Sequence, residues 1–169
     1  TWVFFLLSQR PEVVHRIRAE VDALCGDGEI TIEHAKRLPF IKAVFKETMR
    51  LYPPITFLPR VAAEETTLGG RRVRRGTMVL VAPWTIHRHR ALWKDPELFD
   101  PARFLDGREE EIIPGAYVPF GLGPRVCVGA AFANLEAALF IARLTRRFDF
   151  EAVEPAAVRP VARLTTRPR

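Results

Sequence analysis

The chain has 169 residues, 48% of them hydrophobic, and a formal net charge of +6 at pH 7, which allows one domain with a sizeable core. The charge comes mostly from arginines scattered among apolar residues, without zinc-ligand spacing or the aromatic signature of RNA-binding modules. The composition therefore argues against a nucleic-acid partner. Two cysteines in the whole chain exclude a disulfide framework and indicate a reducing compartment.

Four helical patterns are expected in the first third of the chain, over residues 1–9, 11–24, 32–37 and 39–52. The first is an apolar run that is too short to cross a membrane, and no basic region precedes it to make a signal peptide. We interpret it as the end of a longer buried helix. Cys25, at the end of the second pattern, is expected to be a small core residue or a partly exposed free thiol.

The helix expected over residues 39–52 places a carboxylate on an apolar face. Pro39 suits the first helical position and Pro53 stops the helix. One face carries side chains spaced four, three and four residues apart, namely Phe40, Val44, Glu47 and Leu51. A buried carboxylate needs a partner, and Arg50, three residues after Glu47, lies close enough to provide it. The alternative is an ordinary surface ion pair, which an isolated Glu-x-x-Arg pattern usually makes.

The middle of the chain predicts short strands and a long turn-rich segment. Gly69 and Gly70 between strand-like residues are typical of a hairpin, and Met78–Val81 is expected to be a short buried strand. Residues 95–119 are rich in proline and turn residues. A segment of that length usually carries function or packs on a cofactor.

Residues 120–129, which read Phe-Gly-Leu-Gly-Pro-Arg-Val-Cys-Val-Gly, are the most informative part of the sequence. Cys127 stands in a glycine-rich bend before the helix expected over 129–147, where the helix dipole and free backbone N–H groups favour a thiolate. The glycines allow the backbone to approach a flat, bulky ligand. Arg125 could neutralise an anionic group of that ligand, and Phe120 could shield the sulfur from water. We infer haem as the ligand, with the Cys127 sulfur bound to its iron; the alternative is a buried structural cysteine beside a tight turn.

This loop resembles that of the cytochrome P450 superfamily, the haem-thiolate monooxygenases, whose pattern is F-x-x-G-x-R-x-C-x-G. All fixed positions of the pattern are filled, by Phe120, Gly123, Arg125, Cys127 and Gly129. The Glu47-x-x-Arg50 pattern and the sequence Asp100-Pro101-Ala102-Arg103-Phe104 also resemble motifs of the family, and they precede the loop in the same order as in the family. The resemblance implies a buried network of Glu47, Arg50 and Arg103, in which two guanidiniums satisfy one carboxylate.

The resemblance covers the whole chain, while the chain covers less than half of the family's length. It implies the C-terminal portion of the P450 fold, mainly α with small β-sheets (α+β). This portion would be a single partial domain over residues 1–169, in which residues 164–169 resemble a late strand. The cofactor would be haem b, with Cys127 as the axial thiolate and metal ligand. The contacts to haem would come from Phe120, Gly121, Arg125, Cys127 and Gly129.

Positions outside the loop also take roles from the resemblance. Arg60 is expected to bind a haem propionate, with a solvated arginine as the alternative. His87 is expected either to reach a propionate or to act as a capping or packing histidine. The residues that precede Arg60 are expected to line the substrate pocket: Ile55, Thr56, Phe57 and Leu58.

The implied activity is insertion of one oxygen atom from O2 into an apolar organic substrate, with electrons from a ferredoxin- or flavodoxin-type donor or a flavoprotein reductase. The pocket-roof helices and the residue pair that delivers protons in the family fall outside the chain. No catalytic residue is therefore assigned, and the isolated chain is expected to be inactive. The alternatives are a non-catalytic haem-binding remnant and one half of a split protein. We expect a cytoplasmic location, with a membrane anchor before residue 1 left open.

Overall fold

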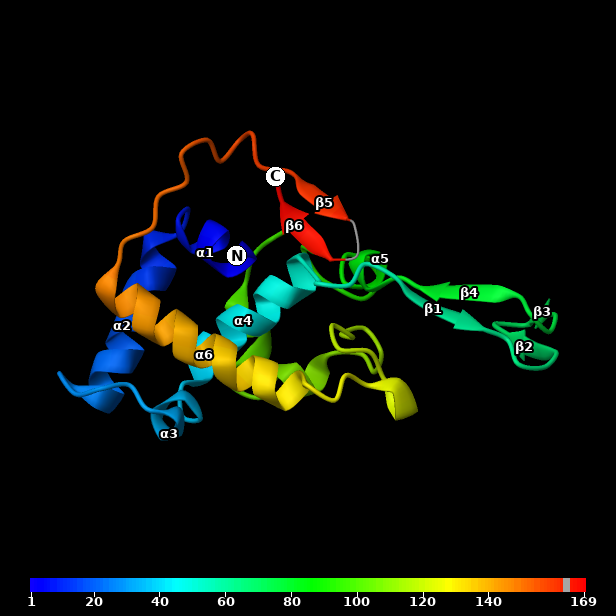
Figure 1. Ribbon diagram of the computed structural model, residues 1–169, viewed down its shortest axis with the longest axis horizontal. Coiled ribbons are helices and arrows are strands. Elements are labelled where there is room, and N and C mark those ends of the chain that lie inside the picture. Colours follow the sequence, from blue (N-terminus) through cyan, green and yellow to red (C-terminus); the bar gives the residue numbers. More distant parts are fainter. Residues whose placement is uncertain (163–164) are drawn as a thin grey trace.

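Six α-helices and six short β-strands form the described part of the chain, residues 1–162 and 165–169 of a computed structural model (Figure 1). The helices are α1 Trp2–Leu7, α2 Pro11–Cys25, α3 Ile32–Ala35, α4 Pro39–Leu51, α5 Pro83–Ile86 and α6 Ala130–Arg147. Short 3-10 helices at Pro101–Phe104, Arg108–Glu111 and Gly123–Arg125 lie between α5 and α6. The expected fold class is confirmed, and each expected helix forms with ends shifted by no more than two residues.

α4 runs through the middle of the helical body, and its ends follow from its sequence (Figure 1). Pro39 begins the helix, and α2 bonds the free N–H groups of its first turn. The carboxylate of Glu20 accepts from Phe40 N at 2.7 Å and from Ile41 N at 3.0 Å. A negative charge at this end also interacts favourably with the helix dipole. At the other end, the helix stops at Tyr52, before two prolines.

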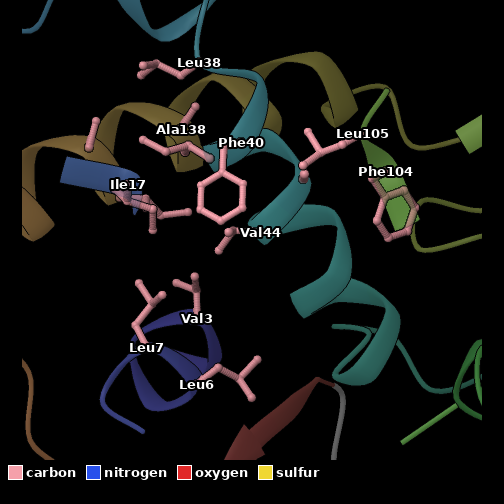
Figure 2. Close-up of a cluster of buried hydrophobic side chains, with 14 of the residues drawn as sticks. Val3, Leu6, Leu7, Ile17, Leu38, Phe40, Val44, Phe104, Leu105 and Ala138 are labelled. Atoms are coloured by element: carbon pink, nitrogen blue, oxygen red, sulfur yellow. The ribbon is translucent and has the colours of Figure 1, made fainter. Parts of the chain in front are cut away.

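Apolar side chains from α1, α2, α3 and α6 meet those of α4 and form the core (Figure 2). The buried members include Val3, Leu6 and Leu7 of α1, Ile17 of α2, Phe40 and Val44 of α4, and Ala138 of α6. Removing this surface from water is the main force that assembles the helices. Because the core holds α6 against α2 and α4, it also fixes the start of the loop that precedes α6.

Each β-sheet is an antiparallel pair of strands. β1 Leu58–Val61 pairs with β4 Met78–Val81, β2 Thr66–Leu68 with β3 Arg71–Val73, and β5 Pro160–Ala162 with β6 Thr166–Pro168. Gly69 and Gly70, at φ values of 54° and 76°, join β2 to β3. The predicted hairpin is therefore confirmed, with the backbone that a two-residue turn requires.

The strand expected over residues 78–81 forms, but the expectation that it is buried is wrong. Met78, Leu80 and Val81 are exposed. β4 pairs only with β1 within the described residues, and the two strands project from the helical body as an arm (Figure 1). The apolar run thus predicted the strand correctly, while its burial depended on tertiary surroundings.

The last strand returns to the start of the chain. Trp2 Nε1 donates to Thr166 O at 3.2 Å, and Thr166 N donates to Pro54 O at 2.8 Å. Of the late strand expected over residues 164–169, the described part contains β6, and Leu164 lies outside the described residues. None of the described helices is both long and apolar enough to span a bilayer.

Candidate functional site

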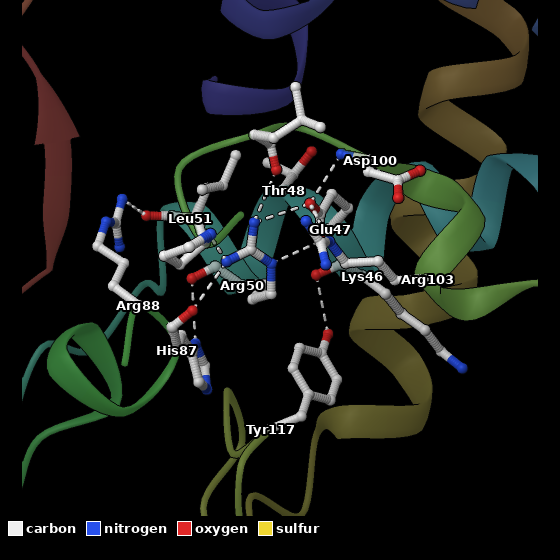
Figure 3. Close-up of polar contacts among 12 residues, drawn as sticks. Lys46, Glu47, Thr48, Arg50, Leu51, His87, Arg88, Asp100, Arg103 and Tyr117 are labelled. Atoms are coloured by element: carbon white, nitrogen blue, oxygen red, sulfur yellow. Dashed lines mark hydrogen bonds and ion pairs between the residues drawn. The ribbon is translucent and has the colours of Figure 1, made fainter. Parts of the chain in front are cut away.

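Arg50 uses all five of its N–H donors inside the protein (Figure 3). Its Nε donates to Glu47 Oε2 at 2.7 Å and its Nη2 to Glu47 Oε1 at 2.8 Å, and both side chains are fully buried. Three backbone carbonyls accept the remaining bonds: His87 at 2.8 Å, Pro96 at 2.7 Å and Leu98 at 3.0 Å. Arg50 therefore joins α4 to segments 37 to 48 residues further along the chain.

Glu47 is the common acceptor of the network. Its Oε1 also accepts from Asp100 N at 2.8 Å, and Arg103 Nε lies 3.4 Å from the same oxygen in an ion pair. The structure thus brings the three expected residues together, with Arg103 as the more distant one. Burial raises the pKa of Glu47, and the hydrogen bonds and charges of Arg50 and Arg103 act in the opposite direction. Both carboxylate oxygens accept N–H donors, which is the arrangement that stabilises the ionised form.

His87 links this network to the segment that leads into the cysteine loop. The residue is fully buried, Val118 N donates to its Nε2 at 2.9 Å, and its Nδ1 lies 3.1 Å from Arg50 O. A ring nitrogen that accepts a bond carries no proton, so Nδ1 carries it and donates to Arg50 O. Burial, helped by the positive charges of Arg50 and Arg88, lowers the pKa of His87 to about 4. The ring is therefore neutral at pH 7.

Backbone hydrogen bonds shape the cysteine loop. Gly121 N donates to Val118 O at 3.1 Å, and Cys127 N donates to Phe120 O at 2.9 Å. Gly121 and Gly123 have φ values of 75° and 66°, which other residues adopt only with strain. The loop therefore depends on glycines that the sequence pattern identified.

The Cys127 thiol is exposed just before α6. A Cβ added to Gly129, the residue before this helix, would stand 3.8 Å from Cys127 Sγ, so any side chain there would lie against the sulfur. The loop and the first turn of α6 also expose apolar side chains: Leu122 (61% exposed), Val126 (52%), Val128 (103%) and Phe132 (69%). Exposed apolar groups gathered in this way mark a binding surface.

The expected substrate-pocket residues divide into two pairs. Thr56 and Phe57 border a cavity of about 170 Å³, together with Trp84, Pro160, Ala162 and Thr166. Ile55 and Leu58 are half-buried and are not among its lining residues in the described part of the chain. Leu58 lies against the cysteine loop instead, with its Cδ1 3.7 Å from the place of a Cβ on Gly121. β1, which begins at Leu58, thus directly follows the cavity-lining Thr56 and Phe57 and also contacts the cysteine loop.

The model of the cytochrome P450 family matches residues 1–166. The chain belongs to the cytochrome P450 family. Cyclooctatin synthase of Streptomyces melanosporofaciens is 38% identical over 160 residues, which are 95% of this chain and 35% of that protein. Cyclooctat-9-en-7-ol 5-monooxygenase from the same organism is 41% identical over 152 residues, 90% of this chain and 33% of that protein. Protein LUTEIN DEFICIENT 5, chloroplastic, of Arabidopsis thaliana is 39% identical over 169 residues, 98% of this chain and 28% of that protein.

Solved P450 structures share the fold. A cytochrome P450 named CYP102L1 matches with a TM-score of 0.90 at 28% identity, covering 99% of this chain and 38% of that one. The heme domain of a P450DA mutant matches with a TM-score of 0.86 at 29% identity, covering 99% of this chain and 37% of that one. The chain spans about a third of the length of the curated relatives named above, and its fold is a part of the P450 fold.

The remaining residues expected to contact haem differ in burial: Arg125 and Arg60 are exposed, and His87 is buried. Within the described residues, Arg60 donates to the neighbouring Pro59 O, at 2.8 Å. The contacts of Arg125 and Arg60 with propionates stay predictions. His87 has both ring nitrogens bonded to backbone groups. It has no nitrogen left for a propionate, so the geometry favours the packing role over the expected propionate contact.

Sequence reasoning missed Val118 and Trp84. Val118 takes part through its backbone N–H, and no side-chain type indicates such a partner. Trp84 borders the cavity of the P450 chain from α5, and a tryptophan in a short helix gives no sequence signal beyond its size. Val118 can be recognised as the donor to His87 only once the fold is known.

Proposed function

We propose that the chain is the haem-ligating part of a cytochrome P450 monooxygenase, with the Cys127 thiolate as the axial ligand of haem b. The observation that carries the proposal is the exposed thiol before α6, among exposed apolar side chains. A flat apolar group at this place would cover that surface, and its carboxylate groups would suit the exposed Arg125 and Arg60. The residues present therefore fit haem.

The chain's own part in the reaction is to hold and tune the sulfur. Bound haem would supply the activation of O2, with one oxygen atom passing to the substrate and the other leaving as water. Backbone N–H groups at the start of α6 would donate to the haem-bound sulfur of Cys127, and such donors tune a metal ligand. Phe120, which is half-buried, would screen the sulfur from water. Gly121 and Gly129 would let the backbone approach the ring.

The proposed substrate is an apolar organic molecule, with Ile55, Thr56, Phe57 and Leu58 along its path. The cavity bordered by Thr56 and Phe57 supports this class, because aromatic and aliphatic groups dominate its lining. One relative, cyclooctat-9-en-7-ol 5-monooxygenase, is named for an unsaturated alcohol. The electrons would come from a ferredoxin- or flavodoxin-type donor or a flavoprotein reductase. An acidic donor suits the net charge of +6.

These 169 residues alone are proposed to form a single partial domain that binds haem weakly and does not hydroxylate a substrate. The reason is that about two thirds of the length of the curated relatives has no counterpart in them. Turnover by the purified chain with an electron donor, above a free-haem control, would contradict this. The proposed location is cytoplasmic, and the two free cysteines support a reducing compartment.

The carbon monoxide difference spectrum of the reduced, haem-loaded full-length P450 that contains these residues tests the ligand. A thiolate gives a red-shifted Soret band, and Cys127→Ser should abolish it while the circular dichroism stays unchanged. Cys25→Ser is the matched control, since Cys25 is a half-buried thiol at the end of α2, and it should keep the band. A band that survives Cys127→Ser would refute the assignment. A haem-loaded full-length protein that shows the band but no turnover would favour the non-catalytic alternative.

A further inference from the structure

We propose that His87 is a positioning residue that holds the Cys127 loop through the backbone of Val118. The inference rests on the proposed function, because it concerns how Cys127 is presented to haem. His87 lies 40 positions before Cys127 in the printed sequence. It acts through hydrogen bonds to other groups and touches neither the substrate nor the sulfur.

The imidazole joins α4 to the segment before the loop. Arg50 Nη1 donates to His87 O at 2.8 Å, and His87 Nδ1 donates to Arg50 O at 3.1 Å. On the other side of the ring, Val118 N donates to Nε2 at 2.9 Å. A ring bonded on two sides fixes the separation between the end of α4 and Val118.

Val118 passes this constraint to the cysteine through a short turn. Val118 O accepts from Gly121 N at 3.1 Å, which closes the turn, and Phe120 O then accepts from Cys127 N at 2.9 Å. Both acceptors, Val118 O and Phe120 O, belong to the turn of residues 118–121. Release of Val118 would therefore free the turn that presents Phe120 O to Cys127.

The surroundings of His87 hold the ring in place. Its ring stacks on Tyr117, with the ring centroids 5.4 Å apart, and the Tyr117 hydroxyl donates to Lys46 O at 3.1 Å. The charged groups that face it, Arg50 and Arg88, are both cationic. They oppose protonation of the ring, so Nε2 remains an acceptor for Val118.

Two variants separate the two sides of the ring. His87→Asn places an amide near the position of Nδ1, which keeps the bond to Arg50 O but falls short of Val118. His87→Gln reaches the position of Nε2, which keeps an acceptor for Val118 N and gives up the bond to Arg50 O. Each variant loses one hydrogen bond of the parent. A merely structural role of His87 would therefore affect both variants alike.

The readouts are the fraction of the red-shifted carbon monoxide Soret band at equal haem content and the deuterium exchange of backbone amides. Loss of one hydrogen bond shifts the equilibrium between a held and a released loop about five-fold. We expect His87→Asn to speed the exchange of the Val118 and Cys127 amides about five-fold and to lower the band fraction, with His87→Gln close to the parent in both. Equal spectra and equal exchange in the two variants would overturn the inference.

A second comparison covers a variant that does not bind haem. If His87→Asn fails in this way, parental exchange at Val118 and Cys127 in His87→Gln supports the inference, and faster exchange there overturns it. A haem-loaded full-length parent without the red-shifted band would instead overturn the proposed function. Amide exchange in the same variants would then still test the link between His87 and Val118.

Discussion

Replacing Arg50 with methionine should remove a large part of the folding free energy. Methionine fills a similar volume with an unbranched chain, but it provides none of the five bonds that Arg50 donates. The Glu47 carboxylate would stay fully buried without its main partner. The carbonyls of His87, Pro96 and Leu98 would each lose a donor.

The magnitude follows from these losses. Breaking a buried pair by removing one partner costs about 3–5 kcal/mol. Each of the three carbonyls, one buried and two partly buried, adds up to roughly 1 kcal/mol when it loses its donor. Such terms are not strictly additive, so we expect a loss of about 4–6 kcal/mol. A domain has about 5–15 kcal/mol in total. Arg50→Met should therefore leave little folded, haem-loaded protein.

Urea unfolding followed by circular dichroism, together with haem content, measures the effect. Arg72→Met is the matched control, because Arg72 forms an ion pair with Glu65 at 2.6 Å with 68% and 52% of the side chains exposed. Such a pair contributes about 0–1 kcal/mol. Arg50→Lys keeps the charge with fewer donors and should fall between Arg50→Met and the parent. An Arg50→Met protein that unfolds within about 1 kcal/mol of the parent would refute the reasoning.

Three further predictions concern α4, the loop and pH. Glu20→Ala should lower the free energy of unfolding by about 1–2 kcal/mol, since it unbonds two N–H groups of α4; the exposed Glu12→Ala is the control, and equal urea midpoints would contradict this. Gly121→Ala should cost about 1–2 kcal/mol because its φ is 75°, and urea unfolding without that loss would count against the strain. His87 is favoured neutral in the folded state, with its pKa lowered from 6.5 to about 4. The contribution of neutral His87 to the free energy of unfolding is fully present above pH 6.5. About 3 kcal/mol of it is lost as the pH falls toward 4. The slope of unfolding free energy with pH should therefore be smaller in His87→Gln, and an unchanged slope would contradict the assignment.

Local chemistry made part of the site predictable from the sequence. Glu47 and Arg50 stand three residues apart on one helix, so their pairing needed only helical geometry and an apolar face. The glycines around Cys127 also indicated the bend from local chemistry, because glycine readily adopts the backbone angles of tight turns. The carbonyl partners of Arg50 could not be predicted, because backbone acceptors have no sequence signal and lie 37 to 48 residues away. His87 allowed two roles in the sequence, and only its buried neighbours distinguish them.

The burial of short strands depended on longer-range structure. The apolar run at Met78–Val81 indicated a strand, since such residues favour extended backbone. Whether a strand is covered depends on what packs against it, and β4 belongs to a projecting two-stranded arm (Figure 1). The five expected helices were predictable nearly to their ends, because prolines and a glycine mark several of these ends.

The two hydrogen bonds of Arg50 Nη1 limit insertions and deletions in the segment between His87 and Pro96. This one nitrogen donates to the carbonyls of both His87 and Pro96, which stand at the two ends of residues 88–95. Connecting segments on a protein surface usually accept insertions and deletions. Here an added or deleted residue would pull one carbonyl away from a donor in the core. Substitutions at exposed positions such as Arg90 and Lys94 leave both carbonyls in place. Across related proteins, this segment should therefore vary at its exposed positions and very little in length.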